Sequence, residues 1–106
     1  MAKYLLKGNY VGEGVTGLRL EGGTRRRAAI DALVTSVGGT LEGVYFAFGE
    51  TDIYVVADLP DHASAVALTL AANATGAVAV TTTVLLTPEE MDAAAHLNPQ
   101  YRAPGV

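Results

Sequence analysis

The chain has 106 residues, of which 50% are hydrophobic and 17% charged, and a formal net charge of −4. These proportions predict one ordered globular domain and exclude a disordered chain, and no apolar run approaches the roughly 18 residues of a membrane span. An acidic chain without cysteine or a long apolar N-terminal segment leads us to expect a cytoplasmic protein with no disulfide, membrane or nucleic-acid partner.

The first half of the chain predicts a strand, a helical region and a hairpin. Residues 3–10 alternate with a strand period, with Tyr4 and Leu6 on one face and Lys3 and Leu5 on the other. Residues 12–37 are helical in their second half, and Gly38-Gly39 ends that helix. Residues 40–48 and 52–59 are rich in β-formers. The short link that contains Gly49 predicts a hairpin between them.

The second half predicts one more helix and strand, followed by a short helix. Pro60-Asp61 begins a helix with Asp61 as its cap, and Gly76 ends it. Residues 77–87 form a β-branched strand, and Pro88 begins a third helix. The order βαββαβ predicts a ferredoxin-like α+β fold, a four-stranded antiparallel sheet with two helices on one face plus a short C-terminal helix. We expect a single domain over residues 1–106, with residues 97–106 as an irregular tail.

The stretch GEGVTG, Gly12 to Gly17, matches the dinucleotide fingerprint G-x-G-x-x-G. A dinucleotide fold needs parallel strands joined by crossovers, whereas the predicted second and third strands form an antiparallel hairpin. The fingerprint also places Glu13 where a pyrophosphate would sit. We therefore expect no nucleotide or other cofactor, and interpret the glycines as shaping a strand-to-helix turn and allowing close packing.

The chain resembles the GYD domain family of small ferredoxin-like proteins over nearly its whole length, to about residue 95. The resemblance is carried by short motifs in a fixed order: Gly38-Gly39-x-Leu41-Glu42, Tyr45-Phe46, Gly49-Glu50-Thr51-Asp52, Asp58-Leu59-Pro60-Asp61, Gly76-x-Val78 and Thr81-Thr82-Thr83. The family's motif tyrosine is Thr51 here, so a role for that phenol does not transfer. The resemblance implies the fold and no established activity.

Two functions are compatible with these residues. The first is a non-catalytic homo-oligomeric module that binds a small ligand or a protein, and the second is an enzyme of the dimeric α/β-barrel kind. We prefer the first, because polar groups are sparse and neither a nucleophile motif nor a metal-ligand spacing appears. Candidate ligand-binding residues are Phe46, Phe48, Asp52, Tyr54 and His62. A plainer interpretation gives Asp52 a turn role and leaves His62 as a neutral surface or half-buried side chain.

The run Arg25, Arg26 and Arg27 is the most unusual local feature. If a helix begins at Thr24, three cations occupy its first turn, where the helix dipole disfavours them, and an anion or a partner's carboxylates would explain the run. If the helix continues unbroken from Gly14, the arginines lie within it and need no partner. We favour the unbroken helix and keep the three arginines as candidate anion-binding residues.

Strand alternation leaves one sheet face without helices, and on this face we expect an interface with a second copy. Residues assigned to it include Leu5, Val44, Phe46, Tyr54 and Val56, with Tyr45 on the helix side. A solvated face should be more polar, so we expect a homodimer with face-to-face sheets. A trimer or larger ring is the alternative, and residues 97–106 are a candidate to reach a neighbour.

Overall fold

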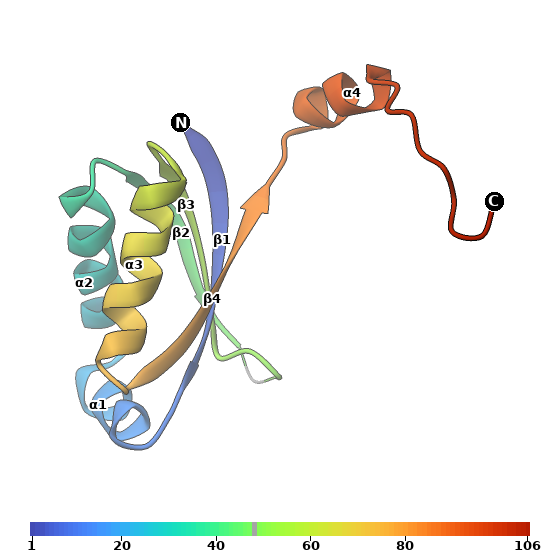
Figure 1. Cartoon of the computed structure of the whole chain (residues 1–106). Helices are drawn as coiled ribbons and strands as arrows, with labels where there is room; N and C mark the ends of the chain where they lie inside the picture. The colour runs from blue at the N-terminus through green and yellow to red at the C-terminus, as the bar shows by residue number, and fades with distance from the viewer. Residues whose placement is uncertain (48) are drawn as a thin grey trace.

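The structure, a computed structural model, describes residues 1–47 and 49–106. In these residues, β1 (Ala2–Tyr10), β2 (Thr40–Phe46), β3 (Ile53–Leu59) and β4 (Val78–Leu85) form an antiparallel sheet in the order β2-β3-β1-β4. The helices are α1 (Glu13–Glu21), α2 (Gly23–Ser36), α3 (His62–Ala74) and α4 (Pro88–His96). Helix α2 packs on β2 and α3 on β4, and both cover the same sheet face (Figure 1). The ferredoxin-like prediction is confirmed, with α1 as an added helix.

The core lies between the sheet and the two helices and follows the predicted strand period. In β3, Ile53, Val55, Ala57 and Leu59 are buried, whereas the residues between them are only half-buried. On β1, Tyr4 and Leu6 are buried on the same side. Helices α2 and α3 add further buried apolar side chains, namely Val34, Ala65 and Leu68. Burial of these apolar surfaces is the main force that holds both helices on the sheet.

The expectation of an unbroken helix through residues 14–37 is wrong. Gly22 has φ 78° and ψ 170°, and it separates α1 from α2. Residues other than glycine strongly disfavour such a positive φ, so Gly22 permits a corner that the helical pattern alone does not mark. Helix α2 therefore begins at Gly23, and Arg25, Arg26 and Arg27 lie near its N-terminus after all.

The predicted faces of β2 are also wrong, because the strand contains a bulge. Leu41 pairs with Ala57, but the next pair is Gly43 with Val56, which leaves Glu42 as the extra residue. One extra residue exchanges the two faces of every later position, since side chains alternate with period two. As a result Val44 and Phe46 lie opposite Val55 and Ile53 on the helix side, while Tyr45 lies opposite Tyr54 on the open face.

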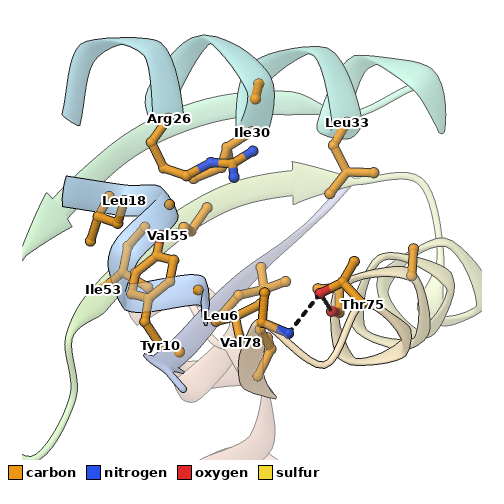
Figure 2. Close-up of a pocket in the computed structure, with 18 of the residues that line it drawn as sticks. Leu6, Tyr10, Leu18, Arg26, Ile30, Leu33, Ile53, Val55, Thr75 and Val78 are labelled. Atoms are coloured by element: carbon orange, nitrogen blue, oxygen red, sulfur yellow. Dashed lines mark hydrogen bonds between the residues drawn. The ribbon is translucent and has the colours of Figure 1, made fainter. Parts of the chain in front are cut away.

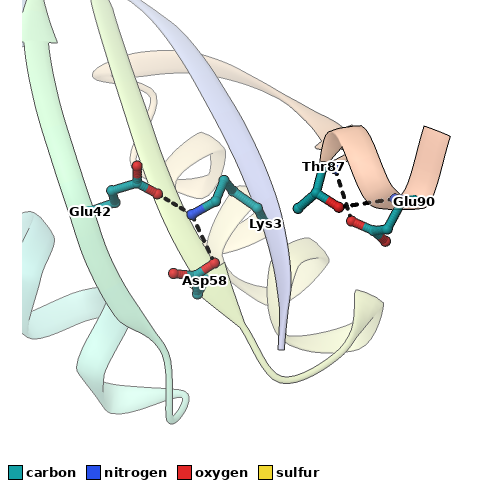
Figure 3. A network of polar contacts seen from close by, with 5 residues as sticks. All are labelled: Lys3, Glu42, Asp58, Thr87 and Glu90. Carbon is teal, nitrogen blue, oxygen red and sulfur yellow. Dashed lines mark hydrogen bonds and ion pairs between the residues drawn. The ribbon is translucent and has the colours of Figure 1, made fainter. Parts of the chain in front are cut away.

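An ion network on the open face connects the bulge to the centre of the sheet. Lys3 on β1 donates to Glu42 and also to Asp58 Oδ1 at 3.1 Å (Figure 3). The hydrogen bonds from Lys3 to Glu42 and then to Asp58 raise the pKa of its ammonium group. Because Glu42 is the extra residue of the bulge, this network favours the shifted register. With Val44 and Phe46 turned away, the open face carries Lys3, Lys7 and Asp58 among its apolar residues.

The C-terminal segment leaves the body of the molecule at the end of β4 (Figure 1). Thr87 and Glu90 form a capping box that starts α4 (Figure 3). Every residue from 86 to 106 is exposed, and the Cα radius of gyration is 16.8 Å. A compact chain of this length would have about 13 Å. We call residues 86–106 the arm.

None of the helices in the described part of the chain is long and apolar enough to cross a membrane.

Candidate functional site

A cavity of about 800 Å³ lies between the sheet and helices α1, α2 and α3. Its walls are mainly apolar side chains from both layers, including Leu6, Ile53, Val55, Val78, Ile30 and Leu33 (Figure 2). Residues from all three helices and from three strands contribute to its lining. A cavity of this size and composition is typical of a small-molecule site.

Small residues explain why this space stays open. Helices α2 and α3 pack mainly on the two outer strands, β2 and β4, so the middle of the sheet lies beneath the gap between them. The lining there is largely glycine and alanine, namely Gly8, Gly14, Gly17, Ala29, Ala71 and Ala72. Larger side chains at these positions would fill part of the cavity, as in a close-packed core.

The stretch GEGVTG closes one end of the cavity. The Val11 N–H donates to the Ala77 carbonyl at 3.0 Å, and Gly12 has φ 52° at the turn into α1. A Cβ on Gly14 would lie only 1.9 Å from the Ala77 oxygen, so only glycine allows α1 to approach the start of β4. The interpretation of these glycines as turn and packing residues is confirmed for Gly12 and Gly14.

Polar groups gather at the α1 end of the cavity. Arg26 extends from α2 into the space above Tyr10 and Val55 (Figure 2), and its Nη1 lies 3.5 Å from Glu21 Oε2. The Arg26 Nε is buried and has no hydrogen-bond partner in the part of the chain that the structure describes. Burial raises the pKa of the Tyr10 phenol, partly offset by the nearby Arg26 charge. The cavity thus combines an apolar body with two hydrogen-bond donors.

The charges around these donors favour a neutral acceptor over an anion. Glu13 and Glu21 line the cavity together with Arg26, so a bound carboxylate would meet two like charges and one opposite charge. A carbonyl-type oxygen accepts from Arg26 or Tyr10 without that repulsion. An unpartnered buried donor costs free energy, and a ligand oxygen that reached Arg26 Nε would remove that cost.

The structure does not bring the predicted ligand-binding residues together. Tyr54 lies on the open face, and Phe46 lies on the helix side against Gly23, whose added Cβ would meet the Phe46 ring at 3.2 Å. Asp52 accepts from the Tyr10 N–H at 3.0 Å and supports the strand end. Phe48 lies outside the described residues.

His62 is placed at the opposite end of the molecule from Arg26, at the start of α3. Its Nδ1 lies 2.6 Å from the hydroxyl of Tyr4, which is 1% exposed. The two rings meet edge to face, with centroids 5.9 Å apart. This contact gives the buried Tyr4 hydroxyl a partner. Asp61 caps the same helix by accepting from Ser64, and those hydrogen bonds lower the pKa of its carboxyl group.

Of the predicted anion-binding residues, only Arg26 lines the cavity. Arg25 and Arg27 are exposed on either side of it. Sequence reasoning missed Tyr10 as a residue of the cavity and Glu21 as the ion-pair partner of Arg26. The sequence signal that could have identified Arg26 is the run of three arginines. In a helix that begins at Gly23, the middle arginine of the run faces the sheet, whereas its two neighbours are exposed. Among the described residues, no group of three or more His, Asp or Glu side chains could hold a metal ion.

Comparison with known proteins gives one match. The family model of the GYD domain matches residues 4–95. No curated protein and no solved structure matches.

Proposed function

The chain belongs to the GYD domain family, and we propose that it binds an apolar small molecule bearing a neutral carbonyl-type oxygen. The binding site would be the cavity between the sheet and helices α1, α2 and α3. The observation that carries this proposal is the buried Arg26 Nε, which has no partner in the described chain and borders a cavity of about 800 Å³.

We assign the cavity a binding role because its donors are poor proton acceptors. Arginine stays protonated at physiological pH. Burial raises the pKa of Tyr10 above its ordinary value, so the phenol also keeps its proton. Both groups would orient a ligand oxygen, while apolar contact with residues such as Leu6 and Leu33 would supply most of the affinity. The tyrosine–histidine pair Tyr4–His62 is outside this site, and we assign it to stability.

Binding can be tested with two aromatic probes of nearly the same shape, 2-acetylnaphthalene and 2-naphthoate. Amide NMR spectra should show 2-acetylnaphthalene shifting cavity residues such as Leu6 and Val55, with 2-naphthoate binding more weakly. Arg26→Gln should weaken binding of the ketone by about tenfold, as expected for one hydrogen bond to a charged group. Arg25→Gln is the matched control on the same helix and should leave binding unchanged.

Three results would contradict the proposal. The first is a set of shifts confined to residues outside the cavity. The second is an equal loss of affinity in Arg25→Gln and Arg26→Gln, which would indicate a general charge effect. The third is tighter binding of 2-naphthoate than of 2-acetylnaphthalene, which would indicate that the ligand at Arg26 is anionic and not neutral.

We also propose that the chain assembles with copies of itself. The arm has no residue buried against its own body, and α4 is only nine residues long. Isolated helices shorter than about 12–15 residues are marginal in water. A neighbouring molecule would supply the missing contacts of α4.

A further inference from the structure

The two edges of the sheet differ in how they are protected. The β2 edge carries the Glu42 bulge, and bulges and charges are common devices that prevent strands of other chains from pairing. The β4 edge has none of these features over its eight residues. No Asp, Glu, Lys or Arg occurs anywhere from residue 63 to residue 88. Strand β4 is therefore the edge at which another strand can pair.

Part of the β4 backbone is already satisfied by a side chain. The Val80 N–H donates to Asn73 Oδ1 at 2.7 Å, and Asn73 Nδ2 donates to the Val80 carbonyl at 3.1 Å. Both backbone groups of Val80 thus bond to a side chain of α3 and not to β1, so they point to the outer side of β4. Backbone groups in a strand alternate in direction, so those of Thr82 and Val84 face the same outer side. No strand of the described chain lies there, and the backbone of another strand would offer a donor and an acceptor to both residues at the same spacing.

An apolar stripe of α3 runs along the same edge. Val66, Leu70 and Asn73 are spaced i, i+4 and i+7, so they share one side of the helix. Asn73 bonds to the β4 edge, which places the stripe beside that edge. Val66 is 53% exposed and Leu70 is 65% exposed. Val84 and Leu86 continue the exposed apolar surface along β4. Such a continuous patch usually marks an interface.

We infer that two copies pair antiparallel through residues 82–86, the end of β4 and the residue that follows it, with their α3 stripes in contact and each arm packed on the partner. This inference specifies the surface for the self-assembly proposed above. A second copy fits this surface, because a twofold axis brings the same surface of both molecules together. An unpaired strand edge can pair with its own copy, and an apolar stripe without charge can pack on its own copy.

The twofold arrangement gives the arm a definite place. With the axis near Val84, residues equally far before and after Val84 face each other along the paired strands, so the end of each β4, where the arm begins, points toward the start of the partner's β4. In each chain the start of β4 lies against α1, through the Val11–Ala77 hydrogen bond. Helix α4 carries three acidic residues (Glu89, Glu90 and Asp92), and the corner of α1 and α2 carries an excess of basic ones, with four arginines (Arg19, Arg25, Arg26 and Arg27) against two glutamates (Glu13 and Glu21). Opposite charges thus meet where α4 would cover the α1 end of the partner's cavity.

Val84→Pro and Val84→Ala form a matched pair that tests the pairing. Proline removes the outward N–H of Val84 while the groups facing β1 stay, and alanine changes the side chain alone. Sedimentation should show a wild-type dimer at micromolar concentration. Val84→Pro should raise the dissociation constant of the dimer by about 30-fold, because the dimer would lose two symmetry-related hydrogen bonds of average strength. Val84→Ala should remain mostly dimeric.

Amide exchange of the unmodified chain provides a second measurement that does not depend on the folding of a variant. The amides of Thr82 and Val84 should become protected as the protein concentration rises, while those of Thr81 and Thr83, which face β1, should be protected throughout. A wild-type monomer would overturn both the interface and the self-assembly proposal, whereas ligand binding in the cavity is measured separately. A dimer that Tyr54→Lys dissociates and Val84→Pro leaves intact would overturn the β4 interface alone and favour pairing of the open faces.

Discussion

Arg26 and Tyr10 line the same end of the cavity, but different forces hold each side chain there. Arg26 forms an ion pair with Glu21 that is partly solvated, and such pairs contribute little to stability. Its long aliphatic stem lies along the apolar wall instead, as arginine stems commonly do. Tyr10 is fixed by its strand, because its N–H donates to Asp52 at 3.0 Å and its backbone pairs with Val78. The phenol position is therefore set by the backbone, and the guanidinium position by packing.

The phenol of Tyr10 should titrate above the ordinary pKa of tyrosine. Burial raises its folded pKa above the ordinary value of about 10. Because the folded state binds this proton more tightly than the unfolded state, the contribution to stability is complete below about pH 10 and lost as the pH rises through the folded pKa. Tyr10→Phe should remove a part of the tyrosinate absorbance that rises above pH 10, and it should reduce the fall in unfolding free energy at alkaline pH. Tyr101→Phe, at a position 79% exposed, is the control and should leave the dependence of the unfolding free energy on alkaline pH unchanged. If Tyr10→Phe leaves the pH dependence of the unfolding free energy unchanged, the Tyr10 phenol is solvated in the folded state.

Two glycines of the α1–α2 region should respond to alanine in opposite directions. Gly22 has φ 78°, and an alanine there would adopt a conformation that costs about 1–2 kcal/mol. Gly17 lies within α1 without a positive φ, and a Cβ added to it would have no other atom within 4 Å. Alanine at Gly17 should stabilise the helix by about 0.5–1 kcal/mol. Urea unfolding of both variants measures the difference. Equal effects would mean that the corner at Gly22 does not require its positive φ.

The elements that local chemistry specifies were predictable from the sequence. Strand alternation identified the buried side of β1 and β3. The cap residue Asp61 and the first-turn proline Pro88 marked helix starts, because both are local signals. The face of β2 was not predictable, since Val44, Tyr45 and Phe46 suit either side. Its choice depends on the bulge at Glu42, which is held by Lys3 from a strand distant in sequence.

The cavity was not predictable from the sequence, because it too depends on contacts between segments that are distant in the chain. Its donors come from β1 and α2, and its open space depends on how far apart α2 and α3 sit on the sheet. No local pattern encodes that spacing. The predicted cluster at the hairpin followed proximity in sequence, but Tyr54 and Phe46 lie on opposite faces once the register is known.

At the scale of the whole molecule, the proposed dimer links stability to concentration. The arm and the β4 edge leave apolar side chains and backbone groups exposed in one copy, and pairing would bury them only in the folded state. Folding and association would then be coupled, so the midpoint of thermal unfolding should rise with protein concentration. A tenfold increase should raise it by about 3 °C, given typical unfolding entropies for two chains of this length. Calorimetry across two decades of concentration measures this slope, and Val84→Pro should flatten it while Val84→Ala should not. A midpoint independent of concentration in the wild type would mean that the single chain is the stable folded unit.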